Sequence, residues 1–183
     1  MENITLNELS KAAHENAVIH GFWDGKPSTE QNMMLVLTEI AEAVEADRNE
    51  TEPCDHRELF ENMLANVDDA TEAFAIAVKN SKYDELADVC IRLFDMAGER
   101  GLDFTKMNPC RYIRTFDKFN FAENAFGLAK GLCRDTYAIE RRIQFGIHYV
   151  VEWCYAMGVS IEWFIRAKME YNTTRGRKHG KRY

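Results

Sequence analysis

The stretch from Met33 to Arg48 reads "MMLVLTEIAEAVEADR", an apolar run that contains two glutamates one helical turn apart. At about 100° per residue, a helix places the larger apolar side chains on one broad face: Met33, Val36, Leu37, Ile40 and Val44. Glu39 and Glu42 lie nearly opposite, among small and apolar neighbours. We expect such a helix to be covered on both sides. Because burying an unpaired charge is costly, the two carboxylates then require a compensating cation.

The composition is that of an ordinary globular chain. Of its 183 residues, 46% are hydrophobic and 29% are charged, which predicts a single domain over 1–183. No apolar run approaches the ~20 residues that cross a bilayer, and the polar N-terminus is unlike a signal peptide. Five cysteines without CxxC spacing favour reduced thiols and a cytoplasmic location. The net charge of -7 argues against a nucleic-acid partner, and we expect no membrane partner.

The helical signal extends along most of the chain. Three prolines and long 3.6-residue patterns predict an all-α protein, a helical bundle. Ser28 and Gln31 have the spacing of a capping box at the start of the second helix, and Gly101 fits the end of a later one. The expected helices cover residues 5–20, 28–48, 57–79, 83–100, 111–157 and 160–174.

A second helix repeats the acidic pattern. The segment "DELADVCIRLFDMAGER", which begins at Asp84, places five charged residues along one stripe: Glu85, Asp88, Arg92, Asp95 and Glu99. The pair Glu85 and Asp88 can converge with Glu39 and Glu42 if the two helices pack face to face. Four carboxylates without histidine favour Mg²⁺, with Mn²⁺ as the other option, over zinc. The alternative is that both pairs lie on solvated helix faces.

The C-terminal segment is basic, although the whole chain is acidic. It reads "KMEYNTTRGRKHGKRY" from Lys168 to Tyr183 and is either a solvated end or an anion site. Lys168, Asn172 and Arg175 are spaced by four and three residues, so a helix presents all three on one face. Cationic donors with an amide between them suit a polyphosphate. Together with an acidic metal site, they suit a metal–nucleoside triphosphate complex.

Three segments together resemble the all-α nucleotide pyrophosphohydrolases of MazG type. They are "LTEIAEAVEADR", "ELADVCIRLFDMAGERGLDF" and the basic C-terminal segment, within roughly 30–48, 82–104 and 160–183. The resemblance implies Mg²⁺-dependent hydrolysis of a nucleoside triphosphate between the α and β phosphates, which gives a monophosphate and pyrophosphate. It further implies a homodimer and a MazG-like core of helices. Relative to compact members of the family, residues at about 49–79 and 105–158 look inserted.

The resemblance also assigns roles residue by residue. Glu39, Glu42, Glu85 and Asp88 match the catalytic metal ligands of the family. Lys168, Asn172 and Arg175 match the positions that meet the substrate phosphates. Two other interpretations remain open: a catalytically inactive helical binding or regulatory protein on the same scaffold, and a dUTPase-like specialist within the same chemistry.

Several residues near these motifs keep two interpretations. Asp95 is either a further metal ligand or the partner of Arg92 in a pair that orients Asp88, and Asp84 is expected to serve the helix N-terminus. The loop aromatics Phe22 and Trp23 either stack on a nucleobase or pack in the core. His179 belongs to the basic segment and is a candidate phosphate contact.

Overall fold

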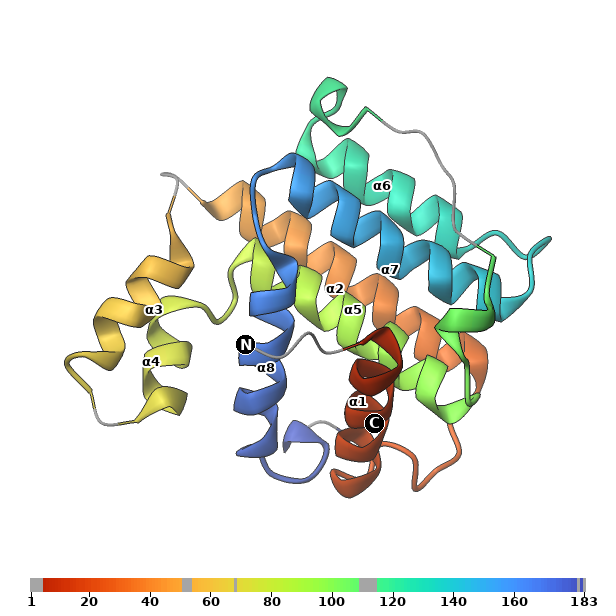
Figure 1. Ribbon diagram of the computed structural model, residues 1–183, viewed down its shortest axis with the longest axis horizontal. Coiled ribbons are helices and arrows are strands. Elements are labelled where there is room, and N and C mark those ends of the chain that lie inside the picture. Colours follow the sequence, from red (N-terminus) through yellow and green to blue (C-terminus); the bar gives the residue numbers. More distant parts are fainter. Residues whose placement is uncertain (1–4, 51–53, 68, 109–114, 181, 183) are drawn as a thin grey trace.

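The computed structural model describes residues 5–50, 54–67, 69–108, 115–180 and 182. Within these ranges the chain forms eight α-helices, three short 3-10 helices and no strand, so the predicted all-α fold is confirmed (Figure 1). The α-helices are α1 (Leu6–Ile19), α2 (Thr29–Asn49), α3 (His56–Leu64), α4 (Ala70–Ala77), α5 (Lys82–Glu99), α6 (Phe121–Leu132), α7 (Ile139–Ala156) and α8 (Ile161–Thr173). The 3-10 helices are η1 (Phe104–Lys106), η2 (Phe116–Lys118) and η3 (Arg177–Gly180).

Helix α5 lies at the centre of the bundle. It contacts α1, α2, α7 and α8, so it is covered on most of its circumference (Figure 1). Its N-terminus is capped by Ser81, whose side chain accepts from the Asp84 N–H, and Gly101 follows its end with a φ of 61°. Most of its apolar residues are buried, including Leu86, Val89 and Leu93. The same helix therefore supplies both the core and, through its charged stripe, the candidate site.

Helix α2 packs along α5, and its predicted apolar face is confirmed. Met33, Val36 and Ile40 are buried, and the Ser28 side chain caps the helix by accepting from the Gln31 N–H. Glu39 is buried too, whereas Glu42 is exposed. The expectation that both acids are covered is therefore wrong for Glu42. A rotation of about 100° per residue turns Glu42 by about 60° from Glu39, which carries it out of the contact with α5.

Two of the predicted long helices are broken in the structure. Residues 57–79 form α3 and α4, because Asp69 begins a new helix by accepting from the Thr71 N–H. The segment 111–157 contains η2, α6 and α7 rather than continuous helix, and residues 111–114 lie outside the described part. Asn120 and Glu123 form a capping box that starts α6, a local signal that the apolar periodicity obscured.

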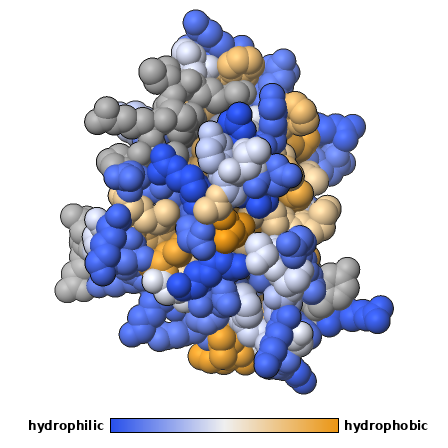
Figure 2. Space-filling view, turned by 90° about the vertical axis from the view of Figure 1, so that its right-hand side faces the viewer, coloured by the Kyte–Doolittle hydropathy of each residue, from blue (hydrophilic) through white to orange (hydrophobic). Residues whose placement is uncertain are grey.

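The segments that look inserted occupy different places. Helices α3 and α4 project as a hairpin at one side of the molecule, with α4 against α8 (Figure 1). Helices α6 and α7 cover α2 and α5, and α7 carries fully buried Trp153 and Ile147 into the main core. Among the described helices, none is long and apolar enough to cross a membrane. On the face in Figure 2, apolar residues reach the surface in patches between hydrophilic ones.

Candidate metal centre

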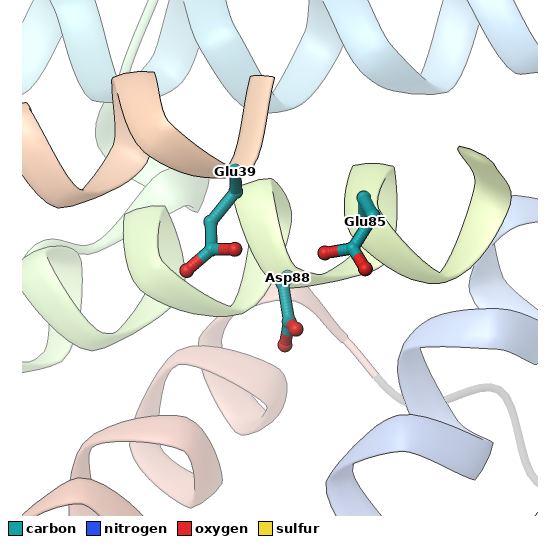
Figure 3. A group of neighbouring side chains, drawn as sticks. All are labelled: Glu39, Glu85 and Asp88. Carbon is teal, nitrogen blue, oxygen red and sulfur yellow. The ribbon is translucent and has the colours of Figure 1, made fainter. Parts of the chain in front are cut away.

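Three of the four predicted metal ligands meet where α2 crosses α5. Glu39 comes from α2, and Glu85 and Asp88 come from successive turns of α5 (Figure 3). Each offers a carboxylate oxygen, and these oxygens all lie within 4.8 Å of one another. Glu42 is exposed and is not part of this group. A compact set of carboxylate oxygens is the ligand chemistry that Mg²⁺ and Mn²⁺ prefer.

A buried lysine from α8 neutralises part of this acidic cluster. The Lys168 Nζ lies 2.7 and 2.8 Å from the two carboxylate oxygens of Asp84 and 2.8 Å from Asp88 Oδ2. Burial alone would lower the pKa of Lys168, but the carboxylates of Asp88 and Asp84 raise it above its ordinary value. All three ammonium hydrogens therefore have a carboxylate oxygen within reach. Lys168, predicted as a phosphate ligand, is here a counter-ion of the cluster.

Asp84 does more than serve the helix N-terminus. It accepts the Asn80 N–H just before α5, as expected, but its side chain is completely buried beside Lys168. Burial raises the pKa of Asp84 to about 6, even though the Lys168 ammonium lowers it. Sequence reasoning missed this buried pair, because residues 84 positions apart give no periodic signal.

Arg92 pairs with Glu39 rather than with Asp95. The Arg92 Nε donates to Glu39 Oε1 across 2.5 Å, and the Glu39 side chain is almost fully buried. Burial raises the pKa of Glu39, and the Arg92 charge opposes this rise. Arg92 of the same chain therefore supplies part of the positive charge that the buried Glu39 carboxylate requires. The predicted pair of Arg92 and Asp95 is replaced by a contact between two different helices.

Glu85 differs from the other acids of the cluster. It is only 6% exposed, and within the described ranges no hydrogen bond or ion pair reaches its carboxylate. Burial, together with the charges of Asp84 and Asp88, raises the pKa of Glu85 from 4.5 to about 8. A cation at this position would lower the cost of ionising Glu85 in this poorly solvated site.

The net charge of the cluster also favours a bound cation. Four carboxylates, those of Glu39, Asp84, Glu85 and Asp88, face the cationic side chains of Arg92 and Lys168. Full ionisation would leave two negative charges, which one divalent cation matches. The residues present therefore fit a metal ion of the Mg²⁺ type, with Glu39, Glu85 and Asp88 as its ligands.

A small polar cavity adjoins the carboxylates. Its volume is about 80 Å³, and Glu39 and Asp88 line it together with Asn172, Arg175 and His179. Asn172 Oδ1 and His179 Nε2 are buried and lack a hydrogen-bond partner within the described part of the chain. The structure thus brings Asn172 and Arg175 to the acidic site, as predicted. The two unpartnered atoms give the cavity unmet hydrogen-bonding capacity.

Asp95 also lines this cavity, and its carboxylate has its own partners. Asp95 Oδ1 accepts from Trp23 Nε1 at 2.9 Å and lies 2.8 Å from His14 Nδ1. Trp23 is therefore a structural donor to Asp95. Phe22 lines the cavity, and its ring lies 5.1 Å from that of His179.

The fold and the site define an all-α bundle with a buried carboxylate cluster beside a cationic C-terminal segment. Comparison with protein-family models, with curated proteins and with solved structures finds no match for this chain. Functional assignment therefore depends on the chemistry of the site.

Proposed function

We propose that this protein is a Mg²⁺-dependent nucleoside triphosphate pyrophosphohydrolase, which cleaves between the α and β phosphates to give a nucleoside monophosphate and pyrophosphate. The observation that supports it best is the cluster of Glu39, Glu85 and Asp88, in which Glu85 is buried without a partner. The adjoining cavity is lined by Arg175 and Asn172, so side chains that could contact a phosphate lie next to the carboxylates, which supports the proposal.

Each residue of the candidate site has a defined role in this proposal. Glu39, Glu85 and Asp88 hold the metal, and the exposed Glu42 is the fourth ligand that the resemblance assigns. A bound Mg²⁺ supplies Lewis-acid stabilisation of the phosphate charge and activates water. Arg92 fixes the Glu39 carboxylate, and Lys168 fixes that of Asp88. Arg175 neutralises phosphate charge, and the unpartnered Asn172 Oδ1 offers a hydrogen-bond acceptor to a donor group of the substrate.

Product analysis tests the proposal directly. Purified protein is incubated with Mg²⁺ and a panel of ribo- and deoxynucleoside triphosphates, and the phosphorus-containing products are separated. Monophosphate and pyrophosphate are expected, and the panel reports whether dUTP is preferred. Glu39→Gln should lower kcat/KM by roughly 100-fold or more, the effect of removing one electrostatic group from an active site. Diphosphate with phosphate as products would contradict the assigned bond.

A matched control variant distinguishes the loss of a metal ligand from the loss of any acidic side chain on α2. Glu45 lies on the same helix, is exposed and pairs with Arg48 at 2.7 Å, away from the cluster. Glu45→Gln should keep wild-type turnover and wild-type Mg²⁺ affinity, measured by isothermal titration calorimetry. Equal losses in both variants would show that general acidity, rather than the cluster, supports activity.

A second candidate is a binding or regulatory protein on the same scaffold. The observation in its favour is that Arg92 and Lys168 already pair with three of the acids. Calorimetry distinguishes the two candidates before any substrate is found. Mg²⁺ binding that is lost in Glu39→Gln supports the enzyme, whereas a folded protein without Mg²⁺ affinity or turnover supports the binding protein.

The proposal includes a homodimer in the cytoplasm. The exposed Phe126, which lines an apolar groove between α2 and α6, supports a contact between copies. Sedimentation equilibrium tests this part independently of the reaction, and a monomer at micromolar concentration would contradict it.

A further inference from the structure

His20 connects the end of the first helix to the C-terminal segment through both of its ring nitrogens. It is the residue that caps the C-terminus of α1 and is only 7% exposed. Its Nδ1 lies 2.8 Å from the carbonyl oxygen of Asn16, and its Nε2 lies 2.9 Å from the carbonyl oxygen of Arg175. Asn16 belongs to the same helix, whereas Arg175 is 155 positions away in the chain.

These two contacts define the protonation state of the ring. A carbonyl oxygen only accepts, and a neutral imidazole carries a single N–H. Both hydrogen bonds can exist together only when both nitrogens are protonated, which makes the ring an imidazolium. The C-terminal end of α1 favours this cation, because the last carbonyls of a helix carry partial negative charge.

The C-terminal segment makes further contacts around His20. The Lys178 N–H donates to the carbonyl oxygen of His20 at 2.8 Å, and Arg177 forms an ion pair with Asp24 in the loop after α1. Lys178 and His179 have positive φ values of 49° and 51°, so the backbone turns back on itself here. The ring of His179 then lies 5.3 Å from the ring of His20.

The charged and titratable groups around His20 are therefore Asp24 from the loop and the side chains of the C-terminal segment. Arg175, Arg177 and Lys178 are cations, and Arg177 is neutralised by Asp24. Burial, together with the nearby charges of Arg175 and His20, lowers the pKa of His179 to about 4. His179 is thus neutral near pH 6, so its ring does not repel an imidazolium at His20.

The docked segment narrows the site. The cavity beside the carboxylates holds about 80 Å³, whereas ligand sites for small molecules usually measure about 300–1,000 Å³. Arg175 and His179 are among the residues that line this cavity, so a whole nucleotide fits there only if the segment moves.

We infer that His20, as an imidazolium, is a positioning residue that holds residues 175–179 closed over the carboxylate site. Its role in turnover rests on the proposed function, whereas the closure itself does not. Loss of the ring proton leaves one nitrogen facing a carbonyl oxygen without a hydrogen between them, which weakens the closed state. The segment is therefore docked while the ring carries both protons and is released when one proton is lost.

The first test uses the unmodified protein without substrate. Nitrogen-15 NMR of the histidine rings at pH 6 should show both nitrogens of His20 protonated. The amide of Lys178, which donates to His20, should be protected from hydrogen exchange at pH 6. Its protection, corrected for the intrinsic pH dependence of exchange, should fall at least 10-fold by pH 8.5. A neutral ring at pH 6, or protection that does not change with pH, would overturn the inference.

A matched pair of variants extends the test. His20→Gln removes the charge and should leave the Lys178 amide poorly protected at every pH. The control is His56→Gln, because His56 Nδ1 also contacts a carbonyl oxygen, that of Ala77, but lies on α3. The control should keep the wild-type profile. If His20→Gln keeps that profile as well, His20 does not hold the segment.

Turnover then shows whether the closure serves catalysis. With the nucleotide found by product analysis, His20→Gln should raise KM more than it lowers kcat at pH 6. The variant and the wild type should converge as the pH rises, because the wild type then loses the same contact. Absence of any nucleotide turnover would contradict the proposed function alone, since the exchange and NMR results stand without it. A uniform loss of kcat at all pH values would contradict the positioning role.

Discussion

Replacement of Lys168 by methionine tests whether the lysine is a counter-ion of the buried cluster. The side chain of Lys168 is 5% exposed, that of Asp84 is fully buried, and that of Asp88 is 21% exposed. Methionine keeps most of the volume but removes the charge, so two carboxylates lose their partner at once. The variant therefore isolates the electrostatic contribution from the packing contribution.

The expected cost follows from the burial of the pair. Removing one partner of a buried ion pair costs about 3–5 kcal/mol, because the other charge is left uncompensated in a poorly solvated site. With a urea m-value of about 2 kcal/mol/M, a loss of about 4 kcal/mol lowers the unfolding midpoint by about 2 M. A domain of typical stability, about 5–15 kcal/mol, tolerates this loss and remains folded in water.

Urea denaturation followed by circular dichroism measures this difference at pH 7 in the presence of EDTA. The control is Arg166→Met on the same helix, where Arg166 pairs with Glu162 near the surface, with side chains 34% and 57% exposed. An exposed helical pair contributes about 0.3–0.5 kcal/mol, so the control should shift the midpoint by only about 0.2 M.

Equal shifts of the midpoint in the two variants would show that Lys168 is not a counter-ion of the buried cluster. A loss below about 1 kcal/mol for Lys168→Met would mean that Asp84 and Asp88 are neutral or solvated in the folded protein. The double variant Lys168→Met with Asp84→Asn provides a further check. It should recover part of the lost stability, because it removes one of the two stranded charges.

Two further perturbations probe the site and the packing beside it. Glu85 binds a proton in the folded protein between its ordinary pKa of 4.5 and its raised pKa of about 8, so in EDTA stability should fall as the pH rises through this window. Glu85→Gln should make this decline shallower in denaturation at pH 5 and pH 8, and an unchanged slope would contradict the assignment. A methyl group on Gly98 would lie 2.6 Å from the Cβ of His14 and 2.7 Å from the carbonyl oxygen of Ser10, so Gly98→Ala should lower Tm by about 3–8 °C. Gly25→Ala has no atom within 4 Å and should leave Tm within about 2 °C in the same calorimetric scan; equal shifts would contradict the clash.

The local part of the fold was predictable, because it depends on neighbours in the chain. The apolar faces of α2 and α5 follow from 3.6-residue periodicity, and the start of α2 follows from the capping residue Ser28. The breaks in the predicted long helices were missed where a cap interrupts an apolar pattern. Asp69 and Asn120 are such caps, and each satisfies backbone N–H groups that a continuous helix would have satisfied itself.

The candidate site was predictable as a set of residues and only partly as an arrangement. The i, i+3 spacing of Glu85 and Asp88 places them on adjacent turns of one helix. It could not show that Glu39 faces them while Glu42 faces solvent, because that depends on how far α2 rotates against α5. The role of His20 had no signal in the sequence beyond its place before Gly21 at a helix end.

What the sequence by itself determined is the helical class, the buried faces and the identity of the acids and bases. These follow from side-chain chemistry and from rotation along a single helix. The tertiary structure alone decided which charges meet, such as Arg92 with Glu39 across 53 positions and Lys168 with Asp84 across 84. The physical reason is that an ion pair between helices depends on their relative rotation and separation, which only the packing of the whole core determines.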